Sequence, residues 1–88
     1  MKRVIWKFEL KGFRCKIEMP KDASILEIQT QKETPCIWAI CDPEAEKETR
    51  TFVVKGTGHV YNFMEEPLIY LGTFQEGRLV WHVFEVGE

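Results

Sequence analysis

The chain has 88 residues, of which 44% are hydrophobic and 30% charged, a balance typical of one small folded domain and not of a disordered chain. Its formal net charge is -2, with 12 Lys and Arg mixed among 14 Asp and Glu, which disfavours a protein that binds duplex nucleic acid. No stretch is long and apolar enough to span a membrane, and residues 1–10 lack the apolar centre of a signal peptide, so we expect a cytoplasmic protein.

Hydrophobic and polar residues alternate along the first part of the chain, which predicts strands. The expected segments are residues 4–10, 14–19 and 24–31. The alternation in the third segment predicts that Leu26 and Ile28 share one face. Lys11-Gly12, Pro20 and the run KETP at 32–35 are turn signals between these strands.

Four more strands are predicted in the second part of the chain, at residues 36–41, 50–55, 68–74 and 78–86. Residues 75–77 separate the last two strands as the loop of a hairpin. The segment DPEAEKE at 42–48 is the one candidate for helix, because Asp42 can cap a helix whose first position is Pro43.

Seven short strands at regular spacing predict an all-β fold: a small single-domain antiparallel sandwich or partly open barrel over residues 1–88, with at most one short helical turn. The long connections are residues 42–50 and 56–67, where function concentrates in such folds.

Two predicted strands, 36–41 and 78–86, are apolar on both faces. Such strands need cover on both sides, which favours a homo-oligomer over a monomer whose long loops fold back onto one face. The residues expected at that interface are Trp38, Trp81 and Phe84. Core packing is the alternative for the tryptophans.

The sequence gives little support for catalysis or metal binding. No serine lies in a nucleophile motif such as GxSxG, and His82 lies within an apolar strand, so His59 is the only realistic general base. The acidic run at 42–48 lacks the spacing of a calcium loop, and the three cysteines lack zinc-site spacing. We therefore expect a protein that is not an enzyme and needs no cofactor or metal.

The stretch KGTGH at 55–59 is the best candidate for a binding site. Glycines open the backbone to a ligand and can expose N–H groups to an anion, while His, Lys and Arg supply donors and positive charge. Tyr61 and Phe63 follow and could stack on a planar base. The predicted ligand-binding residues are Arg50, Lys55, Gly56, Thr57, Gly58, His59 and Tyr61. An ordinary structural bend is the alternative.

The runs IWKFEL, IEMPKDASIL, PCIWAICDPEAEKETRTF, GTGH, YLGTFQ and VWHVFEV occur in that order along nearly the whole chain. Together they resemble a family of short proteins of tailed bacteriophages and prophages that is known only as a domain of unknown function. The chain departs from that pattern between Val60 and Pro67. The resemblance implies a viral origin, the cytoplasm of an infected bacterium and no known reaction, and small phage proteins of this kind often act against host defence.

The leading hypothesis is a homo-oligomeric, non-enzymatic protein that sequesters a phosphate-containing, nucleotide-derived immune signal, as sponge-type anti-defence proteins do. The alternative is a module that binds and inhibits a host defence protein, or a phage accessory protein. A phosphodiester hydrolase with His59 as base is a third, weaker hypothesis. We expect neither duplex nucleic acid nor a membrane as partner.

Overall fold

The computed structural model describes residues 2–62, 64 and 66–87. This part of the chain forms seven strands, each at a predicted segment: β1 (Val4–Glu9), β2 (Arg14–Pro20), β3 (Ser24–Gln31), β4 (Thr34–Cys41), β5 (Lys47–Gly56), β6 (Leu68–Glu76) and β7 (Leu79–Val86). The all-β prediction is therefore confirmed.

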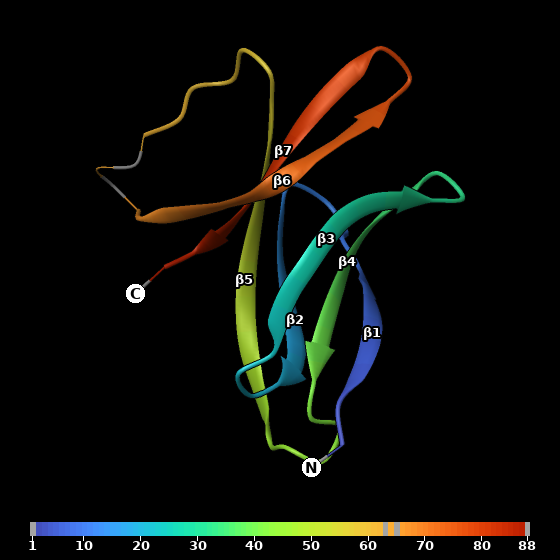
Figure 1. The fold of residues 1–88 in the computed structure, drawn as a ribbon. Coiled ribbons are helices and arrows are strands. Elements are labelled where there is room, and N and C mark those ends of the chain that lie inside the picture. The colour runs from blue at the N-terminus through green and yellow to red at the C-terminus, as the bar shows by residue number, and fades with distance from the viewer. Residues whose placement is uncertain (1, 63, 65, 88) are drawn as a thin grey trace.

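The strands form two antiparallel sheets, one in the order β1-β4-β3 and the other in the order β2-β5-β7-β6. Strands β3 and β6 pack against each other where the two sheets meet. The β3–β4 and β6–β7 hairpins point toward the same side of the molecule and diverge at their tips (Figure 1). The arrangement fits a sandwich or open barrel, and the described strands do not close into a barrel.

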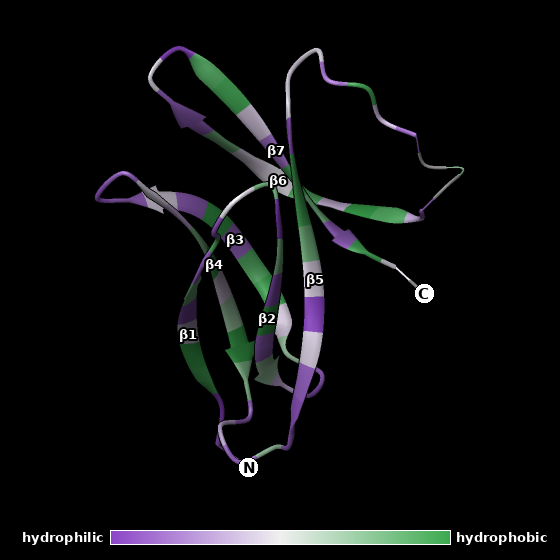
Figure 2. Cartoon of the chain, turned by 180° about the vertical axis from the view of Figure 1, so that it is seen from behind, coloured by the Kyte–Doolittle hydropathy of each residue, from purple (hydrophilic) through white to green (hydrophobic). Residues whose placement is uncertain are grey.

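The core lies between the sheets and follows from the two-residue period of the strands. Phe52 and Val83 are fully buried, and Val54 lies directly opposite Val83 on the same inner face of β5 and β7. Ile37 and Ala39 of β4 face them from the other sheet in the same buried cluster. β5 is hydrophilic over its first half and hydrophobic over its second half, which extends the core toward the hairpin tips (Figure 2).

The prediction that Leu26 and Ile28 share an inner face is wrong. The register between β3 and β4 shifts between Ile25 and Glu27, so Leu26 is an extra residue in a bulge. Ile28 is buried, whereas the Leu26 side chain is 51% exposed. Because a bulge adds one residue to a strand, it reverses the alternation of faces beyond it.

The segment at 42–46 forms a turn, and the helical turn predicted within 42–48 does not form. The N–H of Ala45 donates to the carbonyl of Asp42 at 3.1 Å, and the N–H of Glu44 donates to the Asp42 carboxylate at 3.0 Å. This is the local side-chain bond by which Asp favours turns over helices. Strand β5 then begins at Lys47, earlier than the sequence predicts.

Candidate functional site

The Gly-Thr-Gly-His segment is a tight turn at the end of β5, closed by two hydrogen bonds. The N–H of Gly56 donates to Nδ1 of His59 at 3.0 Å, and the N–H of His59 donates to the carbonyl of Gly56 at 3.0 Å. The imidazole therefore folds back over the strand end. An Nδ1 that accepts a hydrogen bond leaves the neutral ring's proton on Nε2, which becomes a donor to solvent or a ligand.

Thr57 ties this turn to β7. Its N–H donates to the carbonyl of Val80 at 3.1 Å, and its hydroxyl lies 3.2 Å from the same carbonyl and 2.8 Å from Nε2 of His82. The carbonyl of Val80 can only accept, whereas the donor and acceptor in the contact between Thr57 and His82 depend on the tautomer of the His82 ring. The Thr57 hydroxyl is thus held as part of the scaffold.

These bonds decide how many backbone amides remain available to an anion. The N–H groups of Gly56, Thr57 and His59 are all engaged within the protein. Gly58, at φ +95°, is the one residue of the turn whose N–H has no acceptor in the described part of the chain. The turn thus offers one amide, fewer than the several that an anion-binding nest supplies.

A cavity of about 350 Å³ nevertheless lies between this turn and the tip of the β6–β7 hairpin. The Trp81 and His59 rings meet edge to face, with centroids 5.9 Å apart. A Cβ on Gly56 would lie 3.0 Å from Cε1 of His59 and 3.1 Å from Cζ3 of Trp81, so glycine is needed for this close approach. The lining residues are Gly56, Thr57, His59, Arg78, Leu79, Val80 and Trp81.

Arg78 is the functional candidate that sequence reasoning missed. It lies in the two-residue loop between Glu76 and Leu79, the last pair of the β6–β7 ladder, and it lines the same cavity as His59. Gly77 precedes it at φ +60°, a backbone conformation that suits a two-residue hairpin. The sequence showed the hairpin, but no local pattern places its tip beside a turn some 20 residues earlier.

Arg50 is not part of this cavity. It points to the inner face with Phe52, six residues and about 20 Å along β5 from Gly56. Its guanidinium forms a bidentate ion pair with Glu85, at 2.6 and 2.7 Å, and donates to the carbonyl of Ala23 at 2.6 Å. The hydrogen bond that Arg50 donates to Glu85 raises the pKa of Arg50. Arg50 therefore links the second sheet to the β2–β3 turn.

Lys55 and Tyr61 also lie apart from the cavity, on the outer face of the second sheet. Lys55 is directly opposite His82 in the β5–β7 ladder, on the face away from Gly56. The Tyr61 ring lies 5.1 Å from the Phe84 ring and covers part of that face. The prediction for Phe63 concerns a residue outside those the structure describes.

The three predicted interface residues lie in different settings. Trp81 packs against the core cluster from the inner face of β7. Phe84 is on the outer face of the same strand, with its ring 5.4 Å from the Tyr70 ring. Trp38 is on the outer face of the other sheet, between Lys7 and Glu27. Phe84 and Trp38 are therefore half-buried surface residues, on opposite sides of the molecule.

The described residues contain no group of three or more His, Cys, Asp or Glu side chains that is arranged to hold a metal ion. Cys36 and Cys41 are buried and Cys15 is half-buried, each as an unpaired thiol. No helix with the length and apolar character of a membrane span occurs in the part of the chain that the structure describes.

Comparison with known proteins identifies a family but no function. The family model described as a domain of unknown function, DUF7352, matches residues 1–88, the whole chain. No curated protein and no solved structure matches it.

Proposed function

Since the chain belongs to the DUF7352 family, whose function is unknown, its role must be argued from its own residues, and we propose that it binds a small phosphate-bearing nucleotide without turning it over. The binding site is the cavity between the Gly-Thr-Gly-His turn and the β6–β7 tip. The observation that carries this proposal is that Arg78, His59 and Trp81 line one cavity.

The polar side of the cavity suits a phosphate group. Arg78 supplies a guanidinium that can hold two phosphate oxygens, and the Nε2–H of His59 supplies a second donor. The N–H of Gly58 adds a third donor at the edge of the turn. Charge-assisted bonds of this kind are about twice as strong as bonds between neutral groups.

The apolar side suits a nucleobase. Trp81 and Leu79 form part of the wall, and the volume of about 350 Å³ lies near the lower end for small-molecule sites, which is roughly 300–1,000 Å³.

In biological terms we propose the sponge type of role: a phage-encoded protein that lowers the concentration of a nucleotide-derived immune signal by stoichiometric binding. Such a role needs affinity and no chemistry.

Isothermal titration with a panel of cyclic dinucleotides and ADP-ribose derivatives tests this proposal. We expect one ligand per cavity, and at least tenfold weaker binding in Arg78→Ala and in His59→Ala. Lys16→Ala, on the outer face of β2, is the control and should bind as the wild type does. Heat changes that are absent for the whole panel, or equal in all variants, would reject the site.

A protein-interaction module is the second candidate, favoured by apolar side chains on the surface of the second sheet and its loop. Tyr70, opposite Phe84 on the outer face, is 55% exposed, and Val60 and Met64 are each 83% exposed. We propose a second copy of the chain as the occupant of this surface. Sedimentation at micromolar concentration should then show a dimer that Tyr70→Lys converts to monomer, whereas a wild-type monomer would remove this candidate.

A further inference from the structure

We propose that the cleft between the diverging β3–β4 and β6–β7 hairpins is a second binding site, which takes a small organic cation with an apolar or aromatic body. This site differs from the nucleotide cavity because it contains two carboxylates, so its expected ligand is a cation and not an anion.

The cleft exists because the two hairpins extend beyond the packed core. The buried cluster includes Phe74 of β6 and Ile28 and Ile37 of the other sheet. Toward their tips the ribbons of the two hairpins separate (Figure 1). Thr30 of β3 and Phe74 of β6 line the resulting cavity from opposite sheets.

A neighbouring cavity, which shares Phe74 and Glu76 with the first, is apolar and aromatic. It is a cavity of about 260 Å³ bounded by both sheets and by the β1–β2 connection. The rings of Phe13 and Trp81 lie 5.4 Å apart on one side of it. Phe13 is 64% exposed, a large exposed fraction for a phenylalanine that borders a cavity. The lining residues here are Leu10, Gly12, Phe13, Pro35, Val54, Phe74, Glu76 and Trp81.

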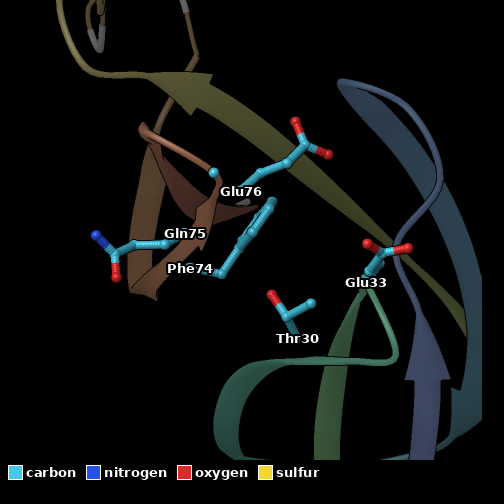
Figure 3. A pocket seen from close by; sticks show the side chains of 6 residues that line it. Thr30, Glu33, Phe74, Gln75 and Glu76 are labelled. Atoms are coloured by element: carbon cyan, nitrogen blue, oxygen red, sulfur yellow. The ribbon is translucent and has the colours of Figure 1, made fainter.

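Two carboxylates stand at the wider part of the cleft, a cavity of about 410 Å³. Glu76 is two residues beyond the buried Phe74, so strand alternation turns it to the inner face of the sheet. Glu33 enters from the β3–β4 turn, where its backbone has φ +68°. In Figure 3, Glu76 and Phe74 extend from β6 on one side of the opening, and Glu33 and Thr30 lie on the β3–β4 hairpin on the other side.

The charges in the cleft are not balanced by the protein. Among the described residues, neither Glu33 nor Glu76 forms an ion pair or a side-chain hydrogen bond. No Lys or Arg lines either of these two cavities. A cation placed between the carboxylates would gain from both, and its body would be removed from water against Phe74 and Trp81, whose ring faces also attract cations. Charge complementarity therefore selects a cationic ligand.

Tryptamine is a suitable probe, because it joins an ammonium group to an indole ring. Two analogues of similar size but different charge, neutral 3-methylindole and anionic indole-3-acetate, separate charge recognition from apolar burial. Titrations followed by ¹H–¹⁵N NMR at low ionic strength should show tryptamine binding about tenfold more tightly than 3-methylindole, with indole-3-acetate weakest.

Glu76→Gln and Glu33→Gln keep the side-chain shape and remove the charge. Each should weaken tryptamine binding about tenfold and leave 3-methylindole binding unchanged. Glu27→Gln, on the outer face of β3, is the matched control and should change nothing. Unchanged indole N–H signals in the free variants verify the fold.

The proposal is overturned if none of the three probes binds, or if tryptamine and 3-methylindole bind equally in wild type and Glu76→Gln. In that case Glu33 and Glu76 are solvated surface residues at the open end of the sandwich and do not bind a ligand. The glutamine variants separate this site from the nucleotide cavity, because Trp81 borders both cavities whereas Glu33 and Glu76 do not line the one that holds His59 and Arg78.

Discussion

Gly56 and His59 are joined by two reciprocal hydrogen bonds, from the N–H of Gly56 to Nδ1 of His59 and from the N–H of His59 to the carbonyl of Gly56, each 3.0 Å long. This pairing fixes the imidazole against the end of β5 and beside Trp81. The N–H groups of Gly56 and His59 are therefore not available to bind an anion. In our account the ligand is recognised mainly by side chains.

Gly56→Ala tests whether this close packing is required. The added methyl would meet His59 at 3.0 Å and Trp81 at 3.1 Å, so the imidazole must move and lose its bond from residue 56. We expect a loss of about 1–2 kcal/mol in the free energy of unfolding, measured by urea denaturation. Gly87→Ala is the control, because its methyl would make only ordinary contacts at 3.6 Å or more. Equal stability of both variants would contradict the packing.

The ion pair of Arg50 with Glu85 should contribute to stability, whereas that of Arg14 with Glu66 should not. The Arg50 and Glu85 side chains are only 17% and 16% exposed. Arg50→Met leaves a largely buried carboxylate and the Ala23 carbonyl without their donor, so we expect a loss of about 2–3 kcal/mol. Adding Glu85→Leu removes the unpaired carboxylate and should restore part of the lost unfolding free energy. A double-mutant cycle with no coupling would contradict this role.

The exposed Arg14–Glu66 pair is the matched comparison. Its side chains are 55% and 33% exposed, and Arg14→Gln should leave the unfolding free energy unchanged within error. A clear loss of stability would contradict this expectation.

The same pair makes a pH-dependent prediction. The hydrogen bond from Arg14 lowers the pKa of Glu66 below its ordinary value of 4.5. A lowered folded-state pKa means that the bond is complete above pH 4.5 and is lost as the pH falls through the lower, folded-state pKa. A carboxyl ¹³C titration should show this, and Arg14→Gln should move the pKa of Glu66 upward. An identical titration curve in the variant would contradict the assignment.

The β3–β4 turn offers a route to higher stability. Lys32 and Glu33 both have positive φ, +50° and +68°, as a two-residue type I′ turn requires. Asn-Gly adopts these angles with less strain, so Lys32→Asn with Glu33→Gly should raise the unfolding free energy by about 1 kcal/mol. Lys16→Asn within β2, where Asn is a poor strand former, should instead lower it slightly. A destabilised double variant would contradict this geometry.

The fold was accessible from sequence because each strand is short and its hydrophobic period is regular. Phe52 and Val54, or Trp81 and Val83, can be assigned to one face by counting alone. Leu26 could not be placed, because a bulge adds one residue without a glycine or proline to mark it. Register shifts of this kind depend on the neighbouring strand and not on local sequence.

The candidate site was only partly accessible, for a related reason. The glycines of the turn mark a special backbone, and His59 follows them directly. The sequence predicted that Arg50 belongs to the same binding site. Arg50 instead lies six residues along the extended strand from Gly56 and forms an ion pair with Glu85. Arg78 and the two cleft carboxylates could not be predicted as site residues, because their role depends on which segments the hairpins lie beside. That placement is set by long-range contacts and not by local sequence.

The most direct test of the central claim is ¹H–¹⁵N chemical-shift mapping of the protein titrated with ADP-ribose and a cyclic dinucleotide. Our account predicts that, for at least one of them, the largest shifts fall on the Gly58 amide, the His59 amide and the Trp81 indole N–H, and that Arg78→Ala abolishes them. Shifts that are absent for both ligands, or that center on Arg50 and Glu85, would contradict it.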